Sequence, residues 1–207
     1  MEQTIKQRTE DWHKQRHGKF TASEIHKLMG VRGLGETGKT YAKEKAIEQL
    51  YGKLEERFVS YDMERGIELE PLAFNKFKEI KELDFIDVKE CGFFEFNENS
   101  GASPDGLVGE DAILEIKCPK PINFFKIVAE NIIDKQYMYQ MQMQMMATNR
   151  NKAYFFNYCI IDGEEFWHEI EVLKDEDIIS KIKERIAEAV DIKNEYITKI
   201  KTNKKWN

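Results

Sequence analysis

The sequence lacks long hydrophobic runs, and its first residues are not apolar. No apolar stretch approaches the ~20 residues that a transmembrane helix needs. The opening residues, MEQTIKQRTEDW, contain no hydrophobic segment of the kind that a secretory signal requires. These absences argue against a membrane partner or a membrane-spanning helix, and they favour a protein of the cytoplasm.

Cysteine and histidine are scarce, which excludes several kinds of metal site. Three cysteines lie far apart, at positions 91, 118 and 159, and none belongs to a C-x-x-C pair. Such a set provides neither a disulfide framework nor the ligands of a zinc or iron–sulfur centre. The histidines, at positions 13, 17, 26 and 168, show no ligand spacing either. We interpret both residue types as incidental.

Basic charge is not in excess. The formal net charge is −6, with 38 acidic and 32 basic side chains, whereas proteins that coat DNA nonspecifically are usually basic. An acidic protein can still bind DNA through a local basic groove. The charge balance therefore restricts any DNA contact to one face or channel.

The chain is expected to form a single domain over residues 1–207, because no repeat, low-complexity linker or Pro/Gly/Ser-rich hinge divides it. The capping box TASE predicts the start of the first helix, and Pro71 predicts a bend or a late start in the third. The helices expected in this half cover 21–29, 39–51 and 66–81.

The second half contains strand patterns and two more helices. An amphipathic pattern of isoleucines ends the chain, and Asp162-Gly163 predicts a turn between the last two strands. Strands are expected at 91–96, 106–108, 112–117, 153–160 and 165–173, with a helix at 134–147. This order predicts an α/β (α+β) fold with a mixed sheet flanked by helices.

The segment SPDGLVGEDAILEIKCPK (103–120) carries the strongest chemical signal. Asp105 opens one strand and Glu115 lies near the end of the next, so a tight hairpin places both carboxylates together. Lys117 shares the strand face of Glu115, because alternate residues of a strand point the same way. Carboxylate oxygens suit Mg²⁺ or Mn²⁺, which activates water for phosphodiester hydrolysis, and a lysine stabilises the developing charge. The alternative is an exposed hairpin with a surface salt bridge.

Two other polar side chains fit this site. Glu70 falls on the apolar stripe of the third helix, where a carboxylate is costly unless a metal ion or a lysine pairs with it. A misjudged helix register would instead leave Glu70 at the surface. Gln140 shares a helical face with Tyr137 and Gln144, where it can hold a water or a phosphate oxygen, or simply face solvent.

A phosphate pocket is expected near the N-terminus. Arg16 and Ser23 lie beside the start of the first helix, whose free N–H groups favour an anion. A guanidinium group can also donate to two phosphate oxygens at once. The alternative is a surface arginine and a serine in the first turn of a helix.

One motif points to a different function. GLGETGKT (33–40) satisfies G-x4-G-K-T, the phosphate-binding loop of NTP-binding proteins. Such a loop needs a buried strand before it, whereas SEIHKLMG is typical of a helix. In a nuclease, Arg32, just before this segment, and Lys39 within it would instead contact the DNA backbone. The alternative is a plain glycine-rich turn.

Taken in order, the motifs resemble the family of lambda exonuclease and the YqaJ-type viral recombinases, within the PD-(D/E)xK nuclease superfamily. The resemblance covers nearly the whole chain. It rests on RHGKFTAS (16–23), GIELE (66–70), SPDGL (103–107), EIKCP (115–119), YMYQMQMQMMAT (137–148) and AYFFNY (153–158).

The resemblance implies a restriction-endonuclease-like core and a Mg²⁺-dependent deoxyribonuclease, with Mn²⁺ as a substitute. It implies 5′-to-3′ degradation of one strand of linear duplex DNA, which leaves a 3′ single-stranded tail. It further implies a homotrimeric ring around the DNA and a single-strand annealing protein as partner in phage recombination. The expected location is the cytoplasm of a bacterial or phage-infected bacterial cell.

Motif position implies a role for each candidate residue. The metal ligands are Asp105, Glu115, the backbone carbonyl of Ile116 and, as a further candidate, Glu70. Lys117 is the catalytic lysine, and Gln140 lies with Glu70 beside the attacking water. Arg16 and Ser23 hold the terminal 5′-phosphate of the DNA.

Two other functions stay open at the level of sequence. One is an endonuclease of the same superfamily, which would also cut closed circular DNA. The other is a non-catalytic DNA-binding or NTP-binding module. The lysines near the C-terminus are typical of a solvated helix end, with a DNA-backbone contact as the alternative. They are Lys199, Lys201, Lys204 and Lys205.

Overall fold

The structure, a computed structural model, describes residues 6–52 and 61–203. Its centre is a sheet of five strands in the order β2-β5-β6-β7-β8. These are β2 (Val88–Lys89), β5 (Gly106–Val108), β6 (Ala112–Lys117), β7 (Lys152–Ile161) and β8 (Glu164–Leu173). Strands β6 and β7 run parallel, and the other neighbours run antiparallel. The predicted mixed sheet is therefore confirmed.

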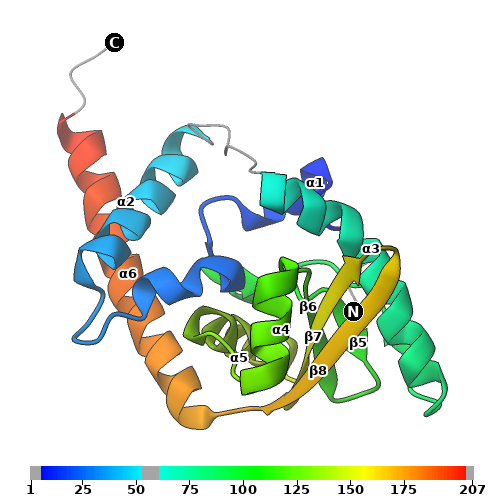
Figure 1. The fold of residues 1–207 in the computed structure, drawn as a ribbon. Coiled ribbons are helices and arrows are strands. Elements are labelled where there is room, and N and C mark those ends of the chain that lie inside the picture. Colours follow the sequence, from blue (N-terminus) through cyan, green and yellow to red (C-terminus); the bar gives the residue numbers. More distant parts are fainter. Residues whose placement is uncertain (1–5, 53–60, 204–207) are drawn as a thin grey trace.

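Helices cover the sheet and extend to one side of it (Figure 1). They are α1 (Glu10–Arg16), the 3-10 helix η1 (Ala22–Leu28), α2 (Gly35–Tyr51), α3 (Tyr61–Glu82), α4 (Pro121–Glu130), α5 (Lys135–Thr148) and α6 (Glu176–Asn203). In Figure 1, α3 lies on one side of the strands, α4 and α5 lie on the other, and α2 runs beside α6. None of the helices in the described ranges is long and apolar enough to span a bilayer.

The central strand β6 is packed from both faces, which makes it a rigid support. Leu114 and Ile116 face α3, where they belong to one cluster with Phe77. Ile113 faces α5 and packs with Met141. Burial of each such side chain contributes about 1.5–3 kcal/mol. The end of β6, which carries the candidate site, is thus held from both sides.

The first predicted helix has the expected extent but a different geometry. It is a 3-10 helix, and Thr21 makes no side-chain cap. Glu24 pairs with Lys27 instead. The physical reason lies in Ala22, Ile25 and Leu28, which are all buried. Their spacing of three residues places them on one face of a 3-10 helix, whose repeat is three residues per turn.

The second helix begins earlier than predicted, and this decides against an NTP-binding loop. Helix α2 starts at Gly35, so most of the G-x4-G-K-T motif is helical. The element before it is the helix η1 rather than a buried strand. A phosphate-binding loop needs a strand that leads directly into it. The NTP-binding hypothesis is therefore wrong.

The third helix also begins earlier, and Pro71 lies inside it. Ile67, in the turn before Pro71, is 42% exposed, whereas Phe77 is fully buried. Proline removes the hydrogen bond to the carbonyl four residues before it, and water can reach that carbonyl at the exposed Ile67. The helix continues because its later turns pack on the sheet.

The prediction missed several short elements. A second sheet, in the order β1-β4-β3, joins Phe20–Thr21, Ser100–Ala102 and Phe94–Asn97. Strand β4 lies where no strand was predicted, and the predicted strand 91–96 is shifted to Phe94–Asn97. Helix α4 and strand β2 were not predicted. At the C-terminus, Lys199 pairs with Glu195, and Lys204 and Lys205 lie outside the described residues.

Candidate active site

The hairpin of β5 and β6 brings Asp105 to the end of β6. The backbone N–H of Asp105 donates to the carbonyl of Leu114 at 2.9 Å. The carboxylate of Asp105 accepts a hydrogen bond from the backbone N–H of Ile116 at 2.7 Å. Asp105 thus bonds to both neighbours of Glu115 in the chain, as the predicted hairpin requires.

Glu115 is the most buried carboxylate of the site, with a side chain that is 2% exposed. Its Oε1 accepts hydrogen bonds from Lys117 Nζ and from Gln140 Nε2, the latter at 2.6 Å. Its Oε2 accepts one from Gln144 Nε2 at 2.6 Å. A buried charge is tolerated when it is paired and hydrogen-bonded, and three donors fulfil that condition. The structure therefore places Lys117 and Gln140 at the predicted site.

Lys117 carries a positive charge in this setting. Burial lowers the pKa of Lys117, but the charges of Glu115 and Asp105 outweigh burial and raise the pKa above its usual value. The ammonium group also lies 4.8 Å from the centre of the Tyr137 ring. The raised pKa favours the protonated form of Lys117, in which the ammonium group can stabilise negative charge.

A pocket of about 300 Å³ opens beside these side chains. Helix α3 contributes Glu70 and Phe74 to its wall, and the hairpin contributes Asp105 and Ile116. The register of α3 thus brings Glu70 toward Asp105, as predicted. Its carboxylate, however, accepts a hydrogen bond from Arg8 at 2.5 Å.

The chemistry of the pocket fits a hard divalent cation. Carboxylate and carbonyl oxygens are the ligands that Mg²⁺ prefers. Asp105, Glu70 and Ile116 line the pocket, and the Glu115 carboxylate lies on the same hairpin beside Asp105. Nearby thiols are poor competitors, because burial raises the pKa of Cys91 and of Cys118 to about 12. Among the described residues, no three His, Cys, Asp or Glu side chains are already arranged as a metal site.

Asp105 makes the stability of the metal-free protein depend on pH. Burial raises the pKa of Asp105 well above its usual value, and the charges of Glu115 and Glu70 act in the same direction. The folded protein therefore holds this proton more tightly than the unfolded chain does. As pH rises above ~4, where an unfolded aspartate ionises, the folded state loses stability.

We expect the melting temperature of the protein in EDTA to fall from mild acid to neutral pH, and Asp105→Asn to remove most of this fall. The difference should be several degrees, since 1 kcal/mol shifts the melting temperature of a domain of this size by about 2–4 °C. Differential scanning calorimetry over a pH series measures it. Asp87→Asn, at an exposed aspartate paired with Lys89, is the control, and its melting temperature should fall with pH as it does in the unmodified protein. An equal fall in melting temperature for Asp105→Asn and the unmodified protein would contradict the expectation.

Arg16 and Ser23 lie together, as predicted, but a third residue joins them. Arg16 donates to Ser23 Oγ at 3.4 Å and to Ser103 Oγ at 3.3 Å. The guanidinium lies 4.1 Å from the ring centre of Trp12, and the Trp12 indole N–H donates to Ser103 Oγ at 2.9 Å. Because η1 is a short 3-10 helix, the cluster depends on these side chains rather than on a helix dipole.

The two clusters are connected through one residue. Gln144 donates both to Glu115 and, at 3.3 Å, to the backbone carbonyl of Ser103. Its Oε1 is buried and has no hydrogen-bond partner among the described residues. A buried acceptor of this kind is costly, so a donor from a ligand or a water would be well placed there.

The family model of the YqaJ-like viral recombinase domain matches residues 11–151. The chain belongs to the YqaJ-like viral recombinase family. The matched residues include the Arg16–Ser103 cluster and the carboxylates of the pocket. A comparison with curated proteins gives no match.

Solved structures with the same fold are alkaline and phage-related exonucleases. The alkaline exonuclease LHK-Exo of Laribacter hongkongensis is 29% identical, with a TM-score of 0.81 over 94% of this chain and 97% of that one. Its complex with dAMP gives 28% identity and a TM-score of 0.80 over the same shares. A phage-related exonuclease of Haemophilus somnus 129PT shares the fold with a TM-score of 0.72. It is 22% identical, and the match covers 89% of this chain and 97% of that one.

Sequence reasoning about this YqaJ-like domain gave Gln144 no role in the site, and it missed Ser103 and Trp12. Gln144 lies one helical turn after Gln140, and that spacing was a usable signal. Ser103 lies two residues before Asp105, at the start of the segment 103–120 that carries the strongest chemical signal. Trp12 gave no signal, because its contact with Ser103 spans 91 residues of sequence.

Arg32 and Lys39 lie apart from these clusters. Arg32 is exposed in the loop before α2. Lys39 is exposed on α2 and pairs with Glu36 at 2.9 Å. Exposure suits the predicted contact with a DNA backbone, which stays a prediction.

Proposed function

We propose that this protein is a divalent-metal-dependent 5′-to-3′ exonuclease of linear duplex DNA. The observation that carries the proposal is the grouping of Asp105 with the paired Glu115 and Lys117 on the β5–β6 hairpin, beside a pocket that Asp105 lines together with Glu70 of α3. The similarity to an alkaline exonuclease at 29% identity over nearly the whole of both chains supports an exonuclease rather than an endonuclease.

Each residue of the candidate site has a separate role in the proposed hydrolysis. A Mg²⁺ ion, or Mn²⁺ in its place, would be held by Asp105, Glu115, the carbonyl of Ile116 and Glu70, and supplies activated water and a polarised phosphate. Lys117 stays protonated and stabilises the charge that develops on the phosphate. Gln140 and Gln144 fix the two oxygens of Glu115 by hydrogen bonds. Fixed ligands of this kind keep a metal site in its productive geometry.

The cluster of Arg16, Ser23 and Ser103 is proposed as the pocket for a terminal 5′-phosphate. It offers one guanidinium group and two hydroxyl groups, a combination that suits phosphate oxygens. Gln144 connects it to Glu115. An anchored 5′ end would present the adjoining phosphodiester to the carboxylates, which provides a physical basis for 5′-to-3′ polarity.

Linear DNA with a 5′-phosphate should be digested faster than the same DNA with a 5′-hydroxyl, by about tenfold or more, because charge-assisted hydrogen bonds to phosphate are strong. Arg16→Ala should remove most of this difference while it leaves the slow reaction on 5′-hydroxyl ends. Initial rates on the two substrates measure it. Lys14→Ala on the same helix is the control, and equal rates for the unmodified protein on both ends would refute the pocket.

The biological setting follows from the same proposal. We infer that residues 1–207 form one nuclease domain, which acts in the cytoplasm of a bacterial or phage-infected bacterial cell. The 3′ tails would be substrates for a single-strand annealing protein in recombination. The family description as a viral recombinase supports this setting.

The protein should assemble as a trimer that encloses DNA. An acidic chain with a confined DNA-binding face can keep its substrate by surrounding it, since net charge alone would not hold the duplex. Light scattering should give about three times the chain mass of 24.4 kDa. A stable monomer at micromolar concentration would refute the ring and leave the nuclease intact.

A comparison of circular and linear DNA tests the proposed function. Covalently closed duplex circles should resist the protein in Mg²⁺, and the same plasmid should be degraded once a restriction enzyme has linearised it. Cutting of closed circles at a comparable rate would make the protein an endonuclease of the same superfamily.

A further inference from the structure

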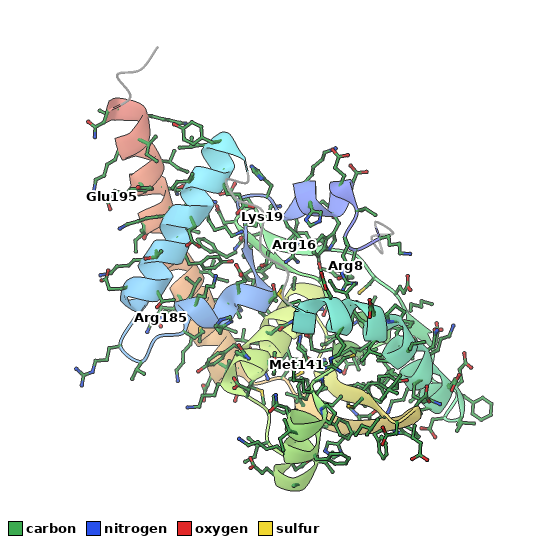
Figure 2. All side chains as sticks on the ribbon, turned by 45° about the horizontal axis from the view of Figure 1, so that its top comes forward. Arg8, Arg16, Lys19, Met141, Arg185 and Glu195 are labelled. Carbon is green, nitrogen blue, oxygen red and sulfur yellow. The ribbon has the colours of Figure 1, made fainter. Side chains whose placement is uncertain are left out.

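Residues 6–8, which precede α1, line the candidate pocket. Gln7 anchors this segment: its side-chain amide donates to the carbonyl of Pro104 at 2.6 Å and to that of Cys91 at 3.3 Å. Both Gln7 and Arg8 line the pocket with Asp105. Figure 2 shows Arg8 and Arg16 on the same side of the molecule, between α1 and α3.

Arg8 is held in an uncommon conformation that points it at Glu70. Its φ is 67°, a left-handed backbone that residues other than glycine rarely adopt. The guanidinium lies 2.5 Å from the Glu70 carboxylate, and the two side chains are 46% and 33% exposed. Strained backbone persists where the surroundings fix it, and it is frequent at functional sites.

The charges of the site explain why an arginine belongs there. Glu70, Asp105 and Glu115 are acidic residues, and Lys117 and Arg8 are basic, so the fully ionised cluster has one negative charge in excess. A bound divalent ion would turn this into one positive charge in excess. That charge matches a single phosphodiester group. Without Arg8 the loaded site would be neutral and would attract the phosphate less.

We propose that Arg8 is a further substrate-binding residue, which pairs with Glu70 in the metal-free protein and binds the scissile phosphate when Glu70 turns to the metal ion. This deepens the proposed function and rests on it. In the structure the Glu70 carboxylate accepts its hydrogen bond from Arg8, and both side chains line the pocket with Asp105. Arg8 and the metal ion compete for Glu70, and the released guanidinium has the planar fork that fits phosphate oxygens.

The test measures metal binding and DNA digestion separately. Arg8→Gln is compared with Arg8→Lys and with Arg185→Gln, which removes an arginine paired with Glu188 on α6, away from Arg8 in Figure 2. Mn²⁺ binding to the DNA-free protein is measured by calorimetry, and kcat and KM are measured on linear duplex DNA in Mg²⁺.

Arg8→Gln should bind Mn²⁺ about threefold more tightly, because the competing cation is gone, and its KM for DNA should rise about tenfold. Arg8→Lys should keep near-native Mn²⁺ affinity. Its KM for DNA should rise less than that of Arg8→Gln, since lysine keeps the charge but lacks the planar guanidinium group. Arg185→Gln should match the unmodified protein in both measurements.

Weaker Mn²⁺ binding by Arg8→Gln would overturn the inference, because it would mean that Arg8 supports Glu70 as a ligand. An unchanged KM, with digestion by the unmodified protein intact, would overturn it as well and leave the exonuclease standing. If the unmodified protein does not digest duplex DNA in Mg²⁺, the proposed function fails, and the phosphate-binding role of Arg8 fails with it. The Mn²⁺ titration then still decides whether Arg8 competes with a metal ion for Glu70.

Discussion

Asp105→Asn and Glu115→Gln should each reduce digestion of linear duplex DNA in Mg²⁺ by about a thousandfold or more, because metal activation supplies several kcal/mol and each 1.4 kcal/mol is a factor of ten in rate. Both changes keep the shape of the side chain. The Ile116 N–H can still donate to the oxygen of an asparagine at position 105. The fold should therefore survive while the site loses a charged ligand.

The matched control for these variants is Glu171→Gln. Glu171 is an exposed acidic residue on β8 that pairs with Lys152 at 3.1 Å, so its loss removes the same charge from the surface and should not change the rate. Circular dichroism confirms folding for each variant, and initial rates are measured over a range of Mg²⁺ concentrations. Near-normal digestion by either site variant would mean that the metal ligands are misassigned.

Lys117→Gln should lower kcat by about a hundredfold to a thousandfold, the usual loss when one preorganised group that stabilises the transition state is removed. It should still bind Mn²⁺ and DNA, because an ammonium group repels rather than holds a metal ion. The glutamine amide can replace one hydrogen bond to Glu115, which limits the cost of leaving a buried carboxylate without its partner.

Calorimetric titration with Mn²⁺ and single-turnover kinetics separate the two effects of Lys117→Gln. Lys152→Gln on β7, which removes a half-buried lysine from its pair with Glu171, is the control and should leave kcat unchanged. Loss of Mn²⁺ binding by a folded Lys117→Gln protein would assign Lys117 a role in building the metal site rather than in stabilising the reacting phosphate.

Much of this site was predictable because its members are close in sequence. Asp105, Glu115 and Lys117 lie on one hairpin, whose strands β5 and β6 match the predicted ranges. Alternation along a strand and closure of a tight turn are local rules, so they fix relative positions without knowledge of the rest of the fold. Gln140 and Glu70 needed only a helical periodicity in addition.

The parts that could not be predicted depend on long-range contacts. The first helix is a 3-10 helix because its buried face recurs every three residues, and burial is decided by α2, α5 and α6. Strand β4 exists because it pairs with β1 and β3, and its three residues have no strand pattern of their own. Arg8 meets Glu70 across 62 residues. No local rule relates such positions.

Digestion of linear duplex DNA labelled at either the 5′ or the 3′ end, with Mg²⁺ and with EDTA, tests the central claim most directly. In Mg²⁺ the 5′ label should be released early as a mononucleotide, and the 3′ label should stay on long single strands. In EDTA neither label should be released. Early release of the 3′ label, or release of either label in EDTA, would contradict the account of a metal-dependent enzyme that starts at a 5′ end.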